Sequence, residues 1–300
     1  MKISDVNINT DNRHGIVGAF FKLLYNLKKL FRTNLIFGLG ITICVAWIIV
    51  ALFAYLIIPY DPISQNIEHR FESPNSMHWF GTDIFGRDVL SRVIVGSRIS
   101  ILAGLLTVFV SAVIGVLFGG LAGFVGGIVD DIMMRISEMF SAFPAIILAM
   151  TITAALGPSL FNTLIALIIT AWPRYARVMR SMTISIKENE YIEAAKALGA
   201  SNTRILLKEI LPNSLGCVLI VATLDIGNQI LNFSGLSFLG LGSPPPTPEW
   251  GSMVADAIAN FYYWWIGTFP GLAILTMGLG ANFIGDGVRD YLDPKLRREF

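Results

Sequence analysis

The sequence predicts an all-α, polytopic membrane protein with six transmembrane helices, and three observations lead to this fold class. Of the 300 residues, 54% are hydrophobic and only 14% are charged, whereas soluble domains carry about a quarter charged residues. The apolar residues form long uncharged runs separated by short charged segments. With the N-terminus inside, 18 of the 22 Lys and Arg residues fall in cytoplasmic segments, as the positive-inside rule requires.

The first 98 residues divide into a tail, a span and an outer segment. Residues 1–34 are basic and lack a long apolar run, so we expect a cytoplasmic tail without a cleaved secretory signal. Within this tail, residues 20–31 have the pattern of a helix lying on the membrane surface. Residues 35–58 carry no charge, and as a helix they would measure about 36 Å, enough to cross a hydrocarbon core of about 30 Å. The polar residues 59–98 would lie outside and end in an amphipathic interface helix, with an apolar stripe of Val89, Leu90, Val93 and Ile94.

Residues 99–287 would form a core of five further spans. The second span, over 99–129, carries glycines four positions apart on one helix face, where a neighbouring helix can pack closely: Gly115, Gly119, Gly123 and Gly127. Asp130, Asp131 and Arg135 would form a short inner loop. Residues 139–173 are too long for one crossing, and the Gly157-Pro158 turn would divide them into spans three and four. Three arginines follow at the inner end, where we expect them to reach lipid headgroups: Arg174, Arg177 and Arg180.

Span five, over 213–235, contains a polar stripe, and span six covers 266–285. The stripe is spaced so that all four residues share one helix face: Asp225, Asn228, Gln229 and Asn232. An ionisable group near the bilayer centre costs about 2.5 to 3.5 kcal/mol, so it must face protein or water. We hypothesise that the stripe lines a translocation path for a polar solute. The alternative is contact with a polar patch on a partner subunit. Residues 288–300 would form a cytoplasmic C-terminal tail.

A charged segment, residues 190–213, separates spans four and five. Its residues favour a short helix over 190–198, which Gly199 caps, and a second helix that Ser201 opens and Pro212 closes. The first helix has only about two and a half turns, so we expect it to depend on contacts at both ends or on a partner's surface. Composition alone also allows an ordinary cytoplasmic loop.

Several motifs resemble those of bacterial ABC importers. Six residues of the 190–213 segment resemble the EAA motif of the permease subunits: Glu193, Ala194, Ala195, Gly199, Leu211 and Pro212. Glu209 stands where that family usually has an apolar residue. Four further strings resemble the second, C-type permease of the dipeptide, oligopeptide and nickel branch: GTD-x-x-GRD-x-x-SR at 81–92, SFLGLG at 237–242, PPTPEWG at 245–251 and IGDGVRDYLDPK at 284–295. The resemblance implies the type I importer permease fold, with the EAA residues forming a coupling helix docked on an ATPase.

The resemblance also implies partners in a bacterial inner membrane, with both termini of this chain in the cytoplasm. These are a second permease, forming a heterodimer, two ATPase subunits or domains that bind ATP and Mg, and an external solute-binding protein. The chain has no G-x-x-x-x-G-K-[ST] loop and no H-E-x-x-H motif, so we expect no catalytic site, metal or cofactor of its own. Its net charge of +1 argues against a nucleic-acid partner.

The substrate stays open between dipeptides, oligopeptides, glutathione-like solutes and nickel chelates. A self-sufficient secondary transporter or channel is the alternative of another class. Such transporters often contain inverted repeats, and no internal repeat is visible here.

Overall fold

The computed structural model describes residues 35–292, and the regular elements of this part are helices. One isolated bridge joins Thr82 to Asp88. The tail over 1–34, with its expected surface helix at 20–31, and the tail residues 293–300 lie outside the described residues.

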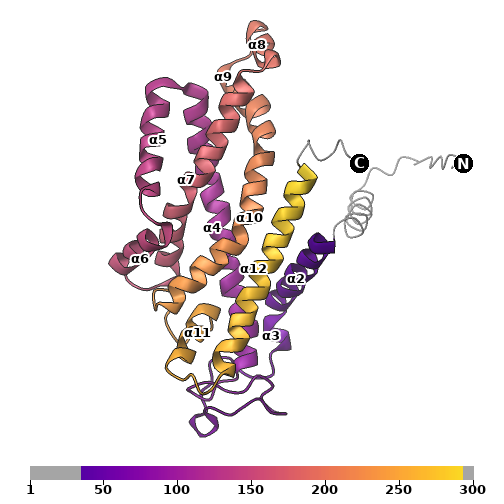
Figure 1. Ribbon diagram of the computed structural model, residues 1–300, viewed down its shortest axis with the longest axis vertical. Helices are drawn as coiled ribbons and strands as arrows, with labels where there is room; N and C mark the ends of the chain where they lie inside the picture. Colours follow the sequence, from indigo (N-terminus) through magenta and orange to yellow (C-terminus); the bar gives the residue numbers. More distant parts are fainter. Residues whose placement is uncertain (1–34, 293–300) are drawn as a thin grey trace, which may run out of the picture.

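Five long helices run along the longest axis of the molecule (Figure 1). They are α2 (Leu35–Leu52), α4 (Val89–Val125), α7 (Leu160–Lys187), α10 (Leu211–Phe238) and α12 (Trp265–Leu292). The shorter helices are α3 (Ala54–Ile57), α5 (Gly127–Ser141), α6 (Ala145–Leu156), α8 (Glu190–Ala197), α9 (Asn202–Arg204) and α11 (Trp250–Ile258). Figure 1 shows α8 at one end of the bundle, whereas α11 and the segment between α3 and α4 lie toward the opposite end. The predicted cytoplasmic segment, 190–213, and the predicted outer segment, 59–98, therefore lie toward opposite ends of the bundle.

The six predicted spans are matched in part. Within residues 35–292, four helical runs are long and apolar enough to cross a membrane: Leu35–Leu52, Val89–Val125, Asn202–Phe238 and Trp265–Tyr291. A fifth results if α5 and α6, which meet at 84°, count as one broken span. At about 42 Å, α7 is also long enough to cross, but its C-terminal half carries three arginines and a lysine.

The expectation of a separate interface helix before the second span is wrong. Helix α4 starts at Val89 and runs without a break for 37 residues. Asp88 caps its N-terminus by accepting a hydrogen bond from the backbone N–H of Ser91 at 2.8 Å. The polar residues beside this first turn are buried; Arg87 and Arg92 are only 2% and 3% exposed. Their charges are paired with Asp83 inside the protein. This end of α4 therefore packs against other parts of the protein and does not lie on the membrane surface.

The third predicted span is also different from expectation. Asp130, Asp131 and Arg135 lie within helix α5 and not in an inner loop. The chain then bends by 84°, and Pro144 stands at the N-cap of α6. Proline lacks a backbone N–H and disfavours helical geometry in the residue before it, which explains the break. With 12 residues α6 measures only about 18 Å, too short to cross the membrane alone.

Three of the four predicted packing glycines lie directly against α7. A Cβ atom on Gly119 would lie 2.1 Å from the carbonyl oxygen of Ala176, and one on Gly115 would lie 2.3 Å from the Cβ of Tyr175. A Cβ on Gly123 would also meet the α7 backbone. The prediction is wrong for Gly127, which begins α5 with a φ of +58° and has open space around it. This glycine serves the helix break, since a positive φ is costly for other residues.

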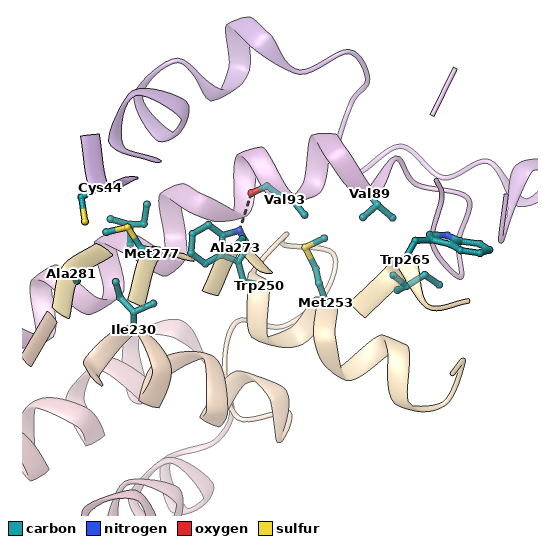
Figure 2. Packing of buried hydrophobic residues seen from close by; sticks show 12 residues of the cluster. Cys44, Val89, Val93, Ile230, Trp250, Met253, Trp265, Ala273, Met277 and Ala281 are labelled. Carbon is teal, nitrogen blue, oxygen red and sulfur yellow. Dashed lines mark hydrogen bonds between the residues drawn. The ribbon is translucent and has the colours of Figure 1, made fainter. Parts of the chain in front are cut away.

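A core cluster extends from the α11 end of the bundle toward its middle, and it is drawn in Figure 2. Its centre is Trp250, which is fully buried and donates a hydrogen bond from Nε1 to the carbonyl oxygen of Val93 at 2.9 Å. Trp47 packs edge-on against it, with ring centroids 4.9 Å apart. This single indole therefore joins α2, α4 and α11.

Candidate functional site

The centre of the candidate site is Asp225, which lies near the middle of α10. Its side chain is 4% exposed. The Oδ1 atom accepts a hydrogen bond from Nη1 of Arg174 at 3.0 Å, and Oδ2 accepts bonds from the Tyr175 hydroxyl at 2.8 Å and from Nε2 of Gln229 at 3.1 Å. A buried carboxylate is tolerated only when it is paired in this way. Asp225 is thus a fixed charge between α7 and α10.

All four residues of the predicted polar stripe line one cavity of about 440 Å³. Asp225 and Gln229 form its buried floor, whereas Asn228 is exposed and Asn232 is half-buried. The opposite wall comes from α7 and from the bend between α5 and α6. The stripe is therefore brought together on one face, next to arginine side chains that the sequence pattern did not associate with it.

The arginines of α7 do not form a row directed at lipid headgroups, and this expectation is corrected. Arg174 pairs with Asp225, and Arg180 forms a two-pronged ion pair with Asp130 of α5, at 2.5 and 2.6 Å. Arg177, between them, donates to the hydroxyl of Ser141 at 2.6 Å. Each of the three thus reaches a polar side chain on another helix. The sequence held a signal that could have suggested the Arg174 pair. Asp225 lies in the middle of one predicted span, and the preceding span carries Arg174 at a similar depth in the membrane.

The predicted coupling loop folds as a short helix held by a single buried side chain. Helix α8 covers Glu190–Ala197, and Gly199 follows with a φ of +83°. Ile192 is 0% exposed and packs with Ile186, Ile205 and Ile210. The remaining EAA residues lie at the surface: Glu193 and Ala194 are exposed, and Ala195 is half-buried. The helix therefore presents a free face of small and acidic side chains.

Pro212 does not close the second helix of this loop, contrary to the prediction. Ser201 caps α9 as expected, but the chain continues through a π-helical turn, Ile205–Ile210, directly into α10. Pro212 occupies the first turn of α10, where its missing N–H matters least. Asn213 and Ser214 then bond back to the carbonyl oxygens of Glu209 and Ile210. A continuous helical run therefore connects the coupling loop to the Asp225 site.

An ion-pair network that the sequence did not predict lies at the end of the bundle opposite α8. Asp83 accepts a bond from Nε of Arg87 at 2.6 Å and lies 3.4 Å from Nε of Arg92. Arg87 also approaches Asp256 of α11 at 3.7 Å. Nearby, the fully buried Glu249 caps α11. The GTD-x-x-GRD-x-x-SR and PEWG strings, far apart in sequence, therefore build one cap at the end of the bundle opposite α8. The available signal was the density of charges in the first string and the lone Glu249 in the second.

Among residues 35–292, no group of three or more His, Cys, Asp or Glu residues is placed to hold a metal ion. The site is thus built from hydrogen-bonding and charged groups of the chain itself. Such groups can bind and guide a polar solute.

Comparisons with known proteins agree with this geometry. A family model described as "Binding-protein-dependent transport system inner membrane component" matches residues 115–298. The chain is 42% identical to the dipeptide transport system permease protein of Alkalihalophilus pseudofirmus over 288 residues, covering 96% of this chain and 93% of that protein. It is 41% identical to the oligopeptide transport system permease protein of Bacillus subtilis over 270 residues, covering 89% and 88%. It is 44% identical to the glutathione transport system permease protein of Escherichia coli over 252 residues, covering 83% of each. The matched family region includes both the cavity and the coupling loop.

Proposed function

The chain belongs to the family of inner membrane components of binding-protein-dependent transport systems, and from this premise we propose that it forms one half of a pathway for short peptides. As a permease of such a system, it is a multi-pass membrane protein that works with a binding protein and an ATPase. The observation that carries the proposal is the polar cavity around Asp225, in the middle of otherwise apolar helices. The names of the three relatives, which refer to dipeptides, oligopeptides and glutathione, support a peptide as the solute.

A second permease subunit would complete the pathway. The cavity is bounded by α7, α10 and the α5–α6 bend and is open on its remaining side, so this chain supplies only part of its wall. A wall of this kind needs a facing surface before it can exclude lipid from a polar solute. A heterodimer of two related permeases, surrounded by membrane lipid, satisfies this need.

Helix α7 would be the sixth crossing. Its charges, which keep it from looking like a span by composition, are paired or bonded to other helices of the bundle. Paired charges that face the protein interior are tolerated in membranes. With six crossings, four precede residues 190–213 and two follow, so α8 and both termini would lie on the same side of the membrane. The distribution of Lys and Arg favours the cytoplasm for that side.

Helix α8 would couple the pathway to the ATPase. Its exposed face around Glu193 and Ala194 is free to dock on one of two ATPase subunits or domains, which bind ATP and Mg. After the turn at Gly199, α9, the π-turn and α10 form one continuous helical run from Asn202 past Asp225. A docked ATPase that changes shape would therefore tilt α10 and rock the bundle between inward-open and outward-open states.

The test is reconstitution of the assembled importer in lipid vesicles. We expect peptide uptake that requires ATP, the binding protein and the ATPase. Ala194→Trp should release the ATPase during co-purification, because the new side chain blocks the docking face. Ala155→Trp, an exposed alanine of α6 outside the coupling loop, is the matched control and should retain it. Uptake by this subunit without ATP, or an ATPase that stays bound to Ala194→Trp, would contradict the proposal.

A further inference from the structure

The cavity around Asp225 contains a cation, Arg177, whose charge no carboxylate of residues 35–292 balances by an ion pair. Three charged side chains line it: Arg174, Arg177 and Asp225. Arg174 and Asp225 form an ion pair at 3.0 Å. Arg177 has a neutral partner, the hydroxyl of Ser141 at 2.6 Å. Among residues 35–292, no carboxylate lies in ion-pair contact with Arg177.

Among the three arginines of α7, Arg177 alone has no carboxylate partner within residues 35–292. Arg174 and Arg180, one turn before and one turn after it on α7, each have a carboxylate partner from a different helix. Asp131 and Glu138 line a second cavity together with Arg177 but make no ion pair with it. Arg177 is exposed and lines the cavity, so its guanidinium can reach a solute there. A cation without a counter-ion at such a surface attracts anions.

The cavity also supplies neutral hydrogen-bond donors for a polar solute. Asn228 and Asn232 lie on α10, in the wall of the same cavity and one and two turns beyond Asp225, and each side-chain amide has two N–H donors. Asp225 cannot compete for Arg177, since Arg174, Tyr175 and Gln229 already occupy its oxygens. The cavity therefore combines neutral donors with a guanidinium that has a hydroxyl partner but, within residues 35–292, no carboxylate partner.

We propose that Arg177 binds the carboxylate of the transported solute during its passage, and that the amides of Asn228 and Asn232 bind other polar groups of the solute farther along the cavity. Guanidinium groups bind carboxylates with two parallel hydrogen bonds, which gives both strength and orientation. The ligand class is a solute with a free carboxylate, such as the C-terminus of a short peptide. A bare divalent cation is disfavoured by the net positive charge. This inference rests on the peptide pathway proposed above and adds that the permease itself selects the solute.

The first experiment compares a peptide with its C-terminal amide in the reconstituted importer. We expect Arg177→Gln to lower the ratio of peptide to amide uptake about tenfold, the loss expected for one charge-assisted hydrogen-bonded pair. Arg135→Gln removes an exposed arginine of α5 that lies outside this cavity, and it should leave the ratio unchanged. An unchanged ratio in Arg177→Gln would overturn the proposal.

A second measurement does not depend on delivery of either peptide by the binding protein. In a Cys217→Ser background, Asn228→Cys would be alkylated with two thiosulfonate reagents of similar size, one an anionic sulfonate and one a cationic trimethylammonium; the other thiol, Cys44, is buried. We expect the anionic reagent to be favoured, and Arg177→Gln to reduce that preference several-fold. No preference, or one that Arg177→Gln leaves unchanged, would overturn the proposal.

The two experiments also separate the inference from the proposed function. If the wild-type importer shows no ATP-dependent uptake, the proposed function fails, whereas the alkylation rates still report on Arg177. If Arg177→Gln instead loses the second permease during purification, the guanidinium pairs with that subunit, and the proposed solute contact is wrong.

Discussion

Arg174 and Asp225 meet at 3.0 Å between α7 and α10, with a nearly buried carboxylate and a guanidinium whose side chain is 49% exposed. The two residues are 51 positions apart in the chain. Their contact places opposite charges on the two helices that form the walls of the cavity. It therefore serves both the stability of the bundle and the polarity of the proposed pathway, and these two roles can be separated by mutation.

We predict that Asp225→Asn destabilises the protein by about 2 kcal/mol, because it removes a charged acceptor of three hydrogen bonds and leaves Arg174 without a counter-ion. The double variant Asp225→Asn with Arg174→Gln should recover most of this loss, since no charge is then unpaired. Thermal unfolding in detergent measures the effect, and uptake by vesicles measures transport. A double variant that is stable yet inactive supports a role in the pathway. A double variant as unstable as the single one would show that the ion pair is not the cause.

Two adjacent glycines of α4 provide a matched test of close helix packing. We predict that Gly119→Ala destabilises the protein by about 1 to 3 kcal/mol, because its Cβ would lie 2.1 Å from the carbonyl oxygen of Ala176. Gly120→Ala should be neutral or stabilising by up to about 1 kcal/mol, since its Cβ meets only the end of the Met179 side chain at 3.3 Å. Unfolding temperatures measured side by side check this. Equal effects at both positions would contradict the backbone contact.

Gly199 allows the coupling loop to be tested through its backbone alone. Its φ is +83°, and no atom lies within 4 Å of the position that a Cβ would occupy. We predict that Gly199→Ala weakens ATPase binding several-fold, because the left-handed conformation costs an alanine about 1 to 2 kcal/mol. Asparagine tolerates this conformation better, so Gly199→Asn should bind more tightly than Gly199→Ala. Co-purification of the ATPase measures both. The opposite order would exclude a conformational role for this glycine.

Glu249 should make the stability of the cap at the α11 end of the bundle depend on pH. Burial raises the pKa of the Glu249 carboxyl, and hydrogen bonds from the backbone N–H groups of Gly251 and Ser252 and from the Ser100 hydroxyl lower it in part. Because the pKa in the folded state is above the usual value of about 4.3, this residue contributes stability that is present below that pH. The contribution is lost as the pH rises through the raised pKa.

Glu249→Gln removes this titration, so we predict that the variant gains stability relative to the wild type as the pH rises above about 4.3. Unfolding temperatures of both proteins over a pH series provide the measurement. Asp61, which lies in the exposed part of the outer segment, offers a control through Asp61→Asn. A difference between Glu249→Gln and wild type that is constant with pH would contradict the prediction.

Local patterns in the sequence predicted much of this structure. The polar stripe that begins at Asp225 lines one cavity because helical periodicity alone decides which side chains share a face. The glycine row of α4 lies against α7 for the same reason, except at Gly127, where the helix has already ended. Helix α8 begins at Glu190 as expected and ends at Ala197, one residue before the predicted boundary. Both ends could be predicted because the residues that start and stop a helix act locally.

The parts that could not be predicted depend on contacts between distant segments. The partner of Asp225 is on another helix, and no periodicity points to Arg174. The polar residues around Arg92 have the pattern of a surface helix, but a cap built by the segment near Glu249 covers them. Pro212 has the residue type of a helix end, yet the preceding π-turn places it in a first turn instead.

The direct approach of the α4 and α7 backbones at Gly119 and Ala176 limits how the protein can change shape. Sliding between helices usually proceeds by side chains that exchange rotamers, and here there are none to exchange. The two helices must therefore travel together as one rigid block. During a transport cycle, helices can then shift relative to each other only at other contacts, such as the one between α10 and α7 beside the cavity.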